Sequence, residues 1–376
     1  MAKEYRVGII GFAHMHVNHV ASVFAEHSST RMVACADTTP LVPERKEDTY
    51  TRGWNLKHCA ETLAIPNVYD DYHEMLRQEE LDLVIVCSEN AQHAAVTQAC
   101  AAAGAHVVVE KPMASSLSDA LAMARAVRDA GTTLVTNWPS TWSPAIRQAQ
   151  ALAAEGAIGR LLEITWRGGH TGPLGPGSGH EGIEDPAARL SGPDRAATWW
   201  HQTEAGGGTM LDYCCYGCCV SRWFLGEPAM AALGMNANLA SHWGDAEDNA
   251  VMLARFPGAL GLFEGSWTTL DPDHGGRKGM VVYGTKGTMI PEQTAEPAVR
   301  IQRGGDRIER VEAAPLPEGR HTLAHGVYGH LEGRHELHPT LEMGFNLEVM
   351  AILDAGLRSS RSGKLEVIEN ATWCIG

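Results

Sequence analysis

The chain has 376 residues, of which 44% are hydrophobic and 20% charged, and its formal net charge is −15. At roughly 100 to 200 residues per domain, this length predicts two domains that each bury a core without disulfide or metal support. The negative charge and the lack of a long Lys/Arg run exclude the electrostatic surface with which proteins bind a nucleic-acid backbone.

The first apolar run, residues 5–12, is too short for the hydrophobic region of a signal peptide and precedes histidines rather than a small-residue cleavage site. No other window approaches the roughly eighteen apolar residues that a membrane-spanning helix needs. The nine cysteines include four in one short segment, unlike a secreted disulfide framework. We therefore expect a cytoplasmic protein with reduced thiols and no membrane partner.

In residues 1–140, short apolar runs rich in β-branched residues alternate with helical patterns. Such continuous runs are typical of strands buried on both faces of a parallel sheet. We expect strands at residues 7–10, 32–36, 83–87, 106–109 and 133–135, and helices at residues 91–103 and 116–129. The repeated strand-helix-strand order predicts an α/β domain with a doubly wound parallel sheet.

In residues 141–376, longer alternating patterns predict a second α/β domain with a large, open, mainly antiparallel sheet. The expected strands are residues 160–167, 229–238, 249–256, 259–268, 278–283 and 298–302. The glycine-rich residues 172–179 predict a loop. A last helix, at about residues 341–358, is expected to pack back near the N-terminal domain.

A dinucleotide site is predicted where the first strand enters the first helix. The segment Gly11-Phe12-Ala13-His14-Met15-His16 keeps only the first glycine of G-x-G-x-x-G, the pattern that lets a backbone approach a pyrophosphate. Asp37 ends the second strand, where a carboxylate accepts hydrogen bonds from the adenosine ribose, and Thr38 and its neighbours supply no arginine for a 2′-phosphate. The expected cofactor is NAD; the alternative is an ordinary strand-turn-helix with an unrelated acidic residue at its edge.

The histidines of this turn raise the question of a metal site, because His16 and His19 share a helical face. Two ligands on one helical turn without a nearby pair of carboxylates make a poor site. We therefore expect His14 and His16 to face the cofactor or its phosphates, and no metal ion.

Three further motifs carry polar residues. Ser88-Glu89-Asn90 and then His93 follow one strand, and Glu110-Lys111-Pro112 closes the next. Because ligands bind beyond the carboxyl ends of the strands in such sheets, both motifs are expected in one crevice. The third motif, at residues 206–217, reads GGGTMLDYCCYG and is followed by RWFLG.

This combination resembles the glucose-fructose oxidoreductase, inositol dehydrogenase and MocA family over nearly the whole chain. The matching elements are the dinucleotide strand, Ser-x-Asn-x-x-His, Glu-Lys-Pro, Gly-Gly-x-x-x-Asp-x-x-x-[His/Tyr], Arg-Trp-x-x-Gly and a Tyr-Gly-Thr-Lys-Gly strand end. The resemblance implies a Rossmann domain followed by a domain with an open antiparallel sheet. It places the NAD site at Gly11, Phe12, Ala13, His14, Met15, Asp37, Thr38, Ser88, Glu89, Asn90, His93, Glu110 and Lys111.

The resemblance also implies that Lys111, Asp212 and Tyr216 are catalytic, with Tyr216 where most members have histidine. A phenol exchanges its proton near neutral pH only if its pKa falls from about 10, and the Lys111 ammonium is a physical means of lowering it. Lys111 would stabilise the developing alkoxide, Tyr216 or Lys111 would take the proton, and Asp212 would orient a hydroxyl or the base. Glu110 would position Lys111 or the cofactor.

Residues that border the substrate pocket in the family suit a sugar ring or an anionic substituent, through aromatic faces and His/Arg donors. The candidates here are His170, His180, Arg189, Arg195, Trp199, Trp200 and Asp212. A place in the core is the alternative for Trp199 and Trp200.

Two clusters could be mistaken for metal sites. The first, Cys214, Cys215, Cys218 and Cys219, is expected to pack in the core as small hydrophobic residues. The second, expected to be solvated or to line an interface, comprises His321, His325, His330, His335 and His338.

The function that the resemblance implies is NAD-dependent oxidation of a secondary hydroxyl of a sugar, glycoside or cyclitol. One alternative is an NAD-dependent glycosidase that oxidises C3 transiently, eliminates, adds water and re-reduces the product. Another alternative is a non-catalytic dinucleotide sensor. Lys111, Asp212 and Tyr216 argue against it, because a sensor needs no acid-base residues. Alternating apolar residues in the second sheet predict an exposed apolar face and therefore a homodimer or homotetramer.

Overall fold

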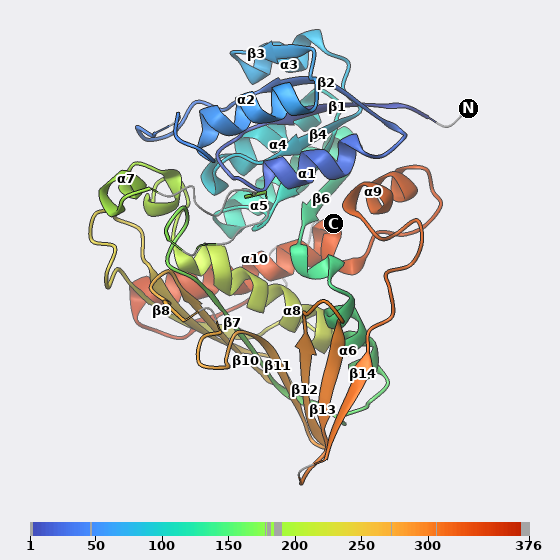
Figure 1. Cartoon of the computed structure of the whole chain (residues 1–376), viewed down its shortest axis with the longest axis vertical. Helices are drawn as coiled ribbons and strands as arrows, with labels where there is room; N and C mark the ends of the chain where they lie inside the picture. Colours follow the sequence, from blue (N-terminus) through green and yellow to red (C-terminus); the bar gives the residue numbers. More distant parts are fainter. Residues whose placement is uncertain are drawn as a thin grey trace.

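The structure is a computed structural model that describes residues 3–45, 47–176, 178, 182–183, 190–271, 273–305 and 307–369. Two sheets organise the described chain, one for each predicted domain (Figure 1). The fold class predicted from the sequence is confirmed, because the first sheet is parallel and doubly wound and the second is mixed and mostly antiparallel.

The N-terminal sheet has six strands in the order β3-β2-β1-β4-β5-β6, and the chain winds outward from β1 in both directions. Its strands are β1 (Tyr5–Ile10), β2 (Thr30–Ala36), β3 (Asn67–Tyr69), β4 (Leu83–Val86), β5 (His106–Glu110) and β6 (Leu134–Asn137). Its helices are α1 (Val17–Ala25), α2 (Arg52–Thr62), α3 (Tyr72–Gln78), α4 (His93–Ala102) and α5 (Leu117–Ala130). All five expected strands are present, and only the short edge strand β3 was not predicted.

The nine-stranded sheet follows the order β14-β13-β12-β11-β7-β10-β9-β8-β15. Its strands are β7 (Leu161–Gly169), β8 (Ala231–Ala237), β9 (Asn249–Arg255), β10 (Leu260–Ser266), β11 (Gly279–Gly284), β12 (Gly287–Glu292), β13 (Ala298–Gln302), β14 (Ile308–Glu312) and β15 (Glu366–Val367). The helices of this half are α6 (Pro144–Ala154), α7 (Gly192–Ala196), α8 (Cys215–Leu225), α9 (Leu323–Leu331) and α10 (Met343–Ser362). β7 and β10 pair in parallel, and the other neighbours are antiparallel.

Three strands of this sheet, β12, β14 and β15, were not predicted from the sequence, and two of these omissions have a physical reason. β12 contains Pro291, which cannot donate to a ladder and is tolerated here because the pairs with β11 end at Met289. β14 has no buried residue, so its apolar side chains give no core-facing pattern.

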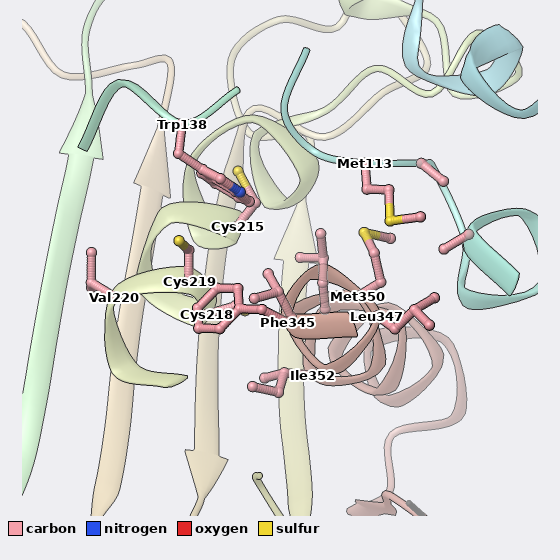
Figure 2. Packing of buried hydrophobic residues seen from close by; sticks show 14 of the residues in the cluster. Met113, Trp138, Cys215, Cys218, Cys219, Val220, Phe345, Leu347, Met350 and Ile352 are labelled. Atoms are coloured by element: carbon pink, nitrogen blue, oxygen red, sulfur yellow. The ribbon is translucent and has the colours of Figure 1, made fainter. Parts of the chain in front are cut away.

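The helices α8 and α10 cover the inner face of the second sheet, and the four clustered cysteines lie in that layer. Figure 2 shows Cys215, Cys218 and Cys219 among Trp138 and Phe345. All four thiols are buried, and burial raises the pKa of each of them. They therefore pack as small hydrophobic residues.

Two C-terminal helices contact the N-terminal half. α10 lies between the two sheets (Figure 1), and its Asp354 Oδ1 accepts a hydrogen bond of 3.2 Å from the Leu117 backbone N–H at the start of α5. α9 packs on α1 and β1, where the Tyr328 ring stacks on Tyr5 at 4.5 Å. The histidines near α9 are partly exposed, and the His325 ring lies 4.6 Å from that of His27. No helix in the described ranges is both long enough and apolar enough to cross a membrane.

Candidate active site

The turn after β1 has room only for a glycine at its first position. Gly11 has a φ of +87°, and a Cβ there would lie 2.5 Å from the Ser88 backbone nitrogen at the end of β4. This close approach explains why Gly11 remains although the other two glycines of the pattern do not. The backbone N–H groups of Ala13 and Met15 make no hydrogen bond within the described part of the chain. These two donors lie beside the start of α1, where a pyrophosphate binds in dinucleotide folds, although both residues are buried in this structure.

Asp37 follows β2 and closes the same crevice. Its Oδ1 accepts hydrogen bonds from the backbone N–H groups of Phe12 at 3.0 Å and Thr38 at 2.8 Å. Arg52 Nη1 donates to the same oxygen at 3.1 Å, so Oδ2 remains for another donor. The Asp37 side chain is 18% exposed, which suits the recognition of ribose hydroxyls at the edge of the site. The residues present therefore fit an NAD molecule at both its phosphates and its adenosine ribose.

Arg52 was not identified from the sequence, although it organises three of the acidic groups around the site. Besides Asp37, the buried guanidinium binds Glu44 at 3.0 Å and Glu89 at 2.8 Å. Burial raises the pKa of Glu44 to about 7 even though Arg52 opposes the rise. An arginine at the start of a polar helix has no sequence pattern that reveals carboxylate partners from three other segments.

The Ser88-Glu89-Asn90 motif and His93 connect the loops of the crevice. Asn90 Nδ2 donates to the Gly206 carbonyl at 2.8 Å and so ties this loop to the glycine-rich motif of the second half. The His93 ring lies between the carbonyls of Pro112 at 3.1 Å and Ser88 at 3.2 Å. These contacts hold the Glu-Lys-Pro loop beside the end of β4.

Lys111 and Asp212 form the centre of the candidate active site. Lys111 Nζ donates to Asp212 Oδ1 at 2.9 Å and to the Asp212 carbonyl at 3.1 Å, and both side chains are buried. Burial disfavours the ammonium, but Asp212 and the other negative groups outweigh it and hold the pKa of Lys111 well above its usual value. Asp212 lies in a π-helical turn, Met210–Cys214, directly before α8; such turns are frequent at functional sites.

Tyr216 is also in this cluster, but its environment differs from the expectation. Lys111 Nζ lies over the phenol ring, 4.8 Å from its centroid, and the Trp166 ring stacks on the phenol with centroids 5.3 Å apart. Burial raises the pKa of Tyr216 well above its usual value, and the lowering by Lys111 is too small to compensate. The Lys111 ammonium does lower this pKa, as the sequence suggested, but burial outweighs the lowering and the phenol keeps its proton.

Two tryptophans of this site were missed. Trp267 Nε1 donates to Asp212 Oδ2 at 3.1 Å, so both carboxylate oxygens of Asp212 are bound. Trp166 lies under Tyr216 as described above. Both lie within or at the end of predicted strands, but strand alternation shows only that a side chain faces inward, not which cavity it lines.

A cavity of about 380 Å³ opens beside Lys111 and Asp212. Its walls come from both halves of the chain and combine aromatic rings with polar groups, as small-molecule sites do. They include His16, Ser140, Trp166, Tyr213, Tyr216 and Lys278.

His16 and Glu110 meet beside this cavity. His16 Nδ1 lies 3.2 Å from Glu110 Oε2, which also accepts the Lys111 backbone N–H at 3.0 Å. Asn137 Nδ2 donates to Glu110 Oε1 at 2.6 Å. Burial acts to raise the pKa of Glu110, but His16, Lys111 and Asn137 outweigh it, and the pKa is below its usual value. Glu110 is therefore a carboxylate, and it fixes the backbone of Lys111.

The three histidines of the turn lie in two different environments in the structure. His14 and His16 lie inside with Glu110, and the potential ligand atoms of these three residues are all within 4.8 Å of one another. His19 is exposed on the surface of α1.

The structure places the substrate candidates in separate positions. Trp199 and Trp200 stack at 3.9 Å and pack on the dinucleotide turn, where Trp199 Nε1 donates to the Ala13 carbonyl at 2.8 Å. His170 lies 5.6 Å from the Tyr213 ring, and burial lowers its pKa to about 4, so it is neutral. Arg195 Nη1 donates to the Thr171 carbonyl at 2.8 Å. The remaining two candidates, His180 and Arg189, lie outside the described residues.

Family models match both halves of the chain: an oxidoreductase family with an NAD-binding Rossmann fold over residues 5–138, and a GFO/IDH/MocA C-terminal domain over residues 146–290. The chain belongs to the GFO/IDH/MocA oxidoreductase family. Its Rossmann domain is NAD-binding, as the sequence predicted. The family assignment made from the motifs is thus confirmed.

Among relatives in this family, the chain is 25% identical over 313 residues to a myo-inositol 2-dehydrogenase of Thermotoga maritima, covering 81% of this chain and 80% of the relative. It is 30% identical over 218 residues to a 1,5-anhydro-D-fructose reductase of Ensifer adhaerens, covering 58% and 59%. Among solved structures, the aldose-aldose oxidoreductase of Caulobacter crescentus shares the fold with a TM-score of 0.71 at 23% identity, covering 97% of this chain and all of the other. The WlbA dehydrogenase of Bordetella pertussis, in complex with NADH and UDP-GlcNAcA, has a TM-score of 0.72 at 21% identity, covering 98% of each chain.

Proposed function

We propose that this oxidoreductase uses NAD to oxidise a secondary hydroxyl of a sugar, glycoside or cyclitol. The observation that carries the proposal is the buried Lys111–Asp212 pair beside a polar and aromatic cavity, next to the cofactor turn. Relatives named as inositol and sugar dehydrogenases support the substrate class. Several hydroxyls on one ring suit the carboxylate, ammonium and indole groups gathered there.

Bound NAD supplies the acceptor for the hydride that leaves the alcohol carbon. The Lys111 ammonium stabilises the negative charge that develops on the substrate oxygen, in a site where burial strengthens that interaction. Asp212, held by Lys111 and Trp267, orients a hydroxyl, and the neutral Tyr216 phenol donates to a ring substituent. In the alternative, Tyr216 or Lys111 itself takes the proton. Burial keeps the pKa of Tyr216 high and Asp212 keeps that of Lys111 high, so substrate binding would have to lower the pKa of one of them.

The test is a substrate screen with the purified protein and NAD. We would incubate it with myo-inositol, D-glucose, D-xylose and 1,5-anhydro-D-glucitol, follow NADH absorbance, and repeat the screen with NADP. Net NADH formation from at least one of these compounds is the expected result, with a higher kcat/KM for NAD than for NADP. NAD binding without NADH formation from any cyclitol or aldose would contradict the proposed substrate class.

A glycosidase that uses NAD without net consumption is the second candidate. The observation that favours it is the Trp199 indole bound to the Ala13 carbonyl, which covers part of the cofactor turn and would help to retain a nucleotide between turnovers. Aryl glycosides in the same screen distinguish the two reactions. Release of the aryl alcohol that requires NAD but leaves no NADH would establish the glycosidase.

We further propose that the exposed face of the second sheet is covered by a second copy of the chain in a homodimer or homotetramer. Leu233 and Leu253 are opposite each other on β8 and β9, and Met235 and Val251 form the next such pair. Their exposed fractions range from 39% to 75%. An apolar patch of this kind on a sheet face is typical of an interface between subunits.

A further inference from the structure

His16 occupies the position of the third glycine in the dinucleotide pattern, so its imidazole is a feature that this turn does not need for binding phosphates. The side chain is buried and reaches from the start of α1 to the cavity that Lys111, Asp212 and Tyr216 also line. His16, a residue of the cofactor-binding domain, therefore lines the same cavity as the candidate catalytic residues.

Glu110 holds this imidazole in one orientation. The carboxylate lies 3.2 Å from His16 Nδ1 and is itself fixed by Asn137 Nδ2 at 2.6 Å and by the Lys111 backbone N–H at 3.0 Å. A histidine that donates to a carboxylate through Nδ1 exchanges its other proton at Nε2. The same arrangement orients the base in many hydrolases, where the carboxylate also stabilises the imidazolium that forms.

We propose that His16, positioned by Glu110, is the general base that takes the proton of the substrate hydroxyl. This inference rests on the proposed function and names the residue that completes it. The other two candidates are poorly suited, because Lys111 is an ammonium paired with Asp212 and Tyr216 is a neutral phenol whose ring contacts Lys111 and stacks on Trp166.

The step balances with the cofactor as oxidant. The O–H bond of the alcohol breaks and its proton goes to His16 Nε2, forming an imidazolium next to the Glu110 carboxylate. The electron pair of that bond becomes the second bond of the carbonyl while the hydride leaves the carbon for the oxidised nicotinamide. After the ketone leaves, the imidazolium returns the proton to water, so each turnover releases one proton.

The test uses His16→Gly, which restores the glycine of the family pattern and leaves a space for added imidazole. We first establish turnover of the wild type with a compound from the screen; if no compound is oxidised, the proposed function fails rather than this inference. The expected result is a loss of kcat of roughly 100-fold to 10,000-fold, while NAD affinity and the KM of the substrate change little. Imidazole in the buffer should restore part of kcat in His16→Gly.

Two further variants keep the result interpretable. Glu110→Gln should lower kcat less than His16→Gly and should not respond to imidazole, because the histidine is still present. His19→Ala, on the exposed side of the same helix, is the matched control and should behave as the wild type.

A kcat that His16→Gly leaves within about threefold of the wild-type value would overturn the inference, as would a loss of kcat that imidazole does not restore when NAD still binds. A cation shared by His14, His16 and Glu110 would overturn it as well. That outcome would appear as loss of wild-type activity in EDTA and its return on adding Zn²⁺ or Mn²⁺.

Discussion

Lys111 Nζ binds both the carboxylate and the backbone carbonyl of Asp212, at 2.9 and 3.1 Å, and so joins the end of β5 to the turn before α8. The pair unites two motifs that are distant in the sequence. It links the cofactor half of the site to the substrate half through a single buried ammonium. Removing the Lys111 ammonium is therefore expected to lower both the stability of the fold and the rate of the reaction, and the two effects can be measured separately.

Lys111→Met should lower kcat at least about 100-fold, because the developing alkoxide loses its positive neighbour. It should also lower the free energy of unfolding by about 3 to 5 kcal/mol, since Asp212 becomes an uncompensated buried charge. The double variant Lys111→Met/Asp212→Asn should recover most of that stability and none of the activity. Urea denaturation measures the stability and NADH formation measures the activity. If Lys111→Met alone were as stable as the wild type, the argument from a buried ion pair would be contradicted.

Asp37→Asn should weaken NAD binding about tenfold to 100-fold, because the ribose hydroxyls lose a charged acceptor worth about 1.5 to 3 kcal/mol. The asparagine can still accept the Phe12 N–H, so the turn should keep its shape. Calorimetric titration with NAD measures the effect. Asp48→Asn, a surface residue paired with Arg45, is the control; equal affinities for the two variants would rule out the ribose contact.

Leu253→Glu should convert the assembled protein to a monomer, because a carboxylate would be buried against apolar neighbours at the proposed interface. Leu253 faces Leu233 on β8 and Leu262 on β10 in the sheet register. Val68→Glu, on the edge strand β3 of the N-terminal sheet, replaces an exposed apolar residue outside the proposed interface and should leave the mass unchanged. Light scattering after size exclusion measures the mass, and a monomeric wild type would contradict the proposal.

His201 should make the protein more sensitive to acid. Its ring is enclosed near Trp267 and Trp243, and neither ring nitrogen has a hydrogen-bond partner in the described part of the chain. Burial, together with Arg195, lowers the pKa of His201 to about 3. The unfolded chain therefore binds a proton at this residue as the pH falls below about 6.5, whereas the folded protein does not, and stability is lost.

The expected loss from this one histidine is about 1.4 kcal/mol per pH unit between pH 6.5 and 3. His201→Phe, which preserves the ring shape, should remove that contribution. Its unfolding free energy, measured with urea at pH 7.5 and 5.0, should fall less than that of the wild type. Parallel falls in the two proteins would show that His201 titrates alike in the folded and unfolded states.

The sequence predicted the sheets well because their signals are local. The apolar runs at Leu83–Val86 and His106–Glu110 are buried on both faces, as continuous β-branched segments should be. The helix expected at residues 116–129 is α5, which begins after Ser116, whose side chain accepts from the Asp119 N–H, and ends at Gly131, which has a φ of 67°. β14 lacked such a signal, because an exposed edge strand needs no apolar periodicity.

Of the residues discussed at the site, those that stand in a recognisable sequence motif were predicted, and those outside any motif were not. Lys111 and Asp212 each stand in a recognisable motif, so both were named as catalytic candidates. Arg52 and Trp267 stand in none, and only the folded chain shows that they bind Asp37 and Asp212. The pKa of Tyr216 depends on a balance between burial and the lysine charge, and a sequence specifies the charge but not the degree of burial.

The packing of α9 on α1 and β1 has a consequence for biosynthesis. Tyr328 completes the hydrophobic layer to which Tyr5 and Phe24 belong, although it is translated long after them. The N-terminal domain therefore emerges from the ribosome with an apolar surface that only a late segment of the chain can cover. Folding of this protein during translation must keep that surface from other chains until α9 has been made, which makes the nascent N-terminal domain a natural client for chaperones.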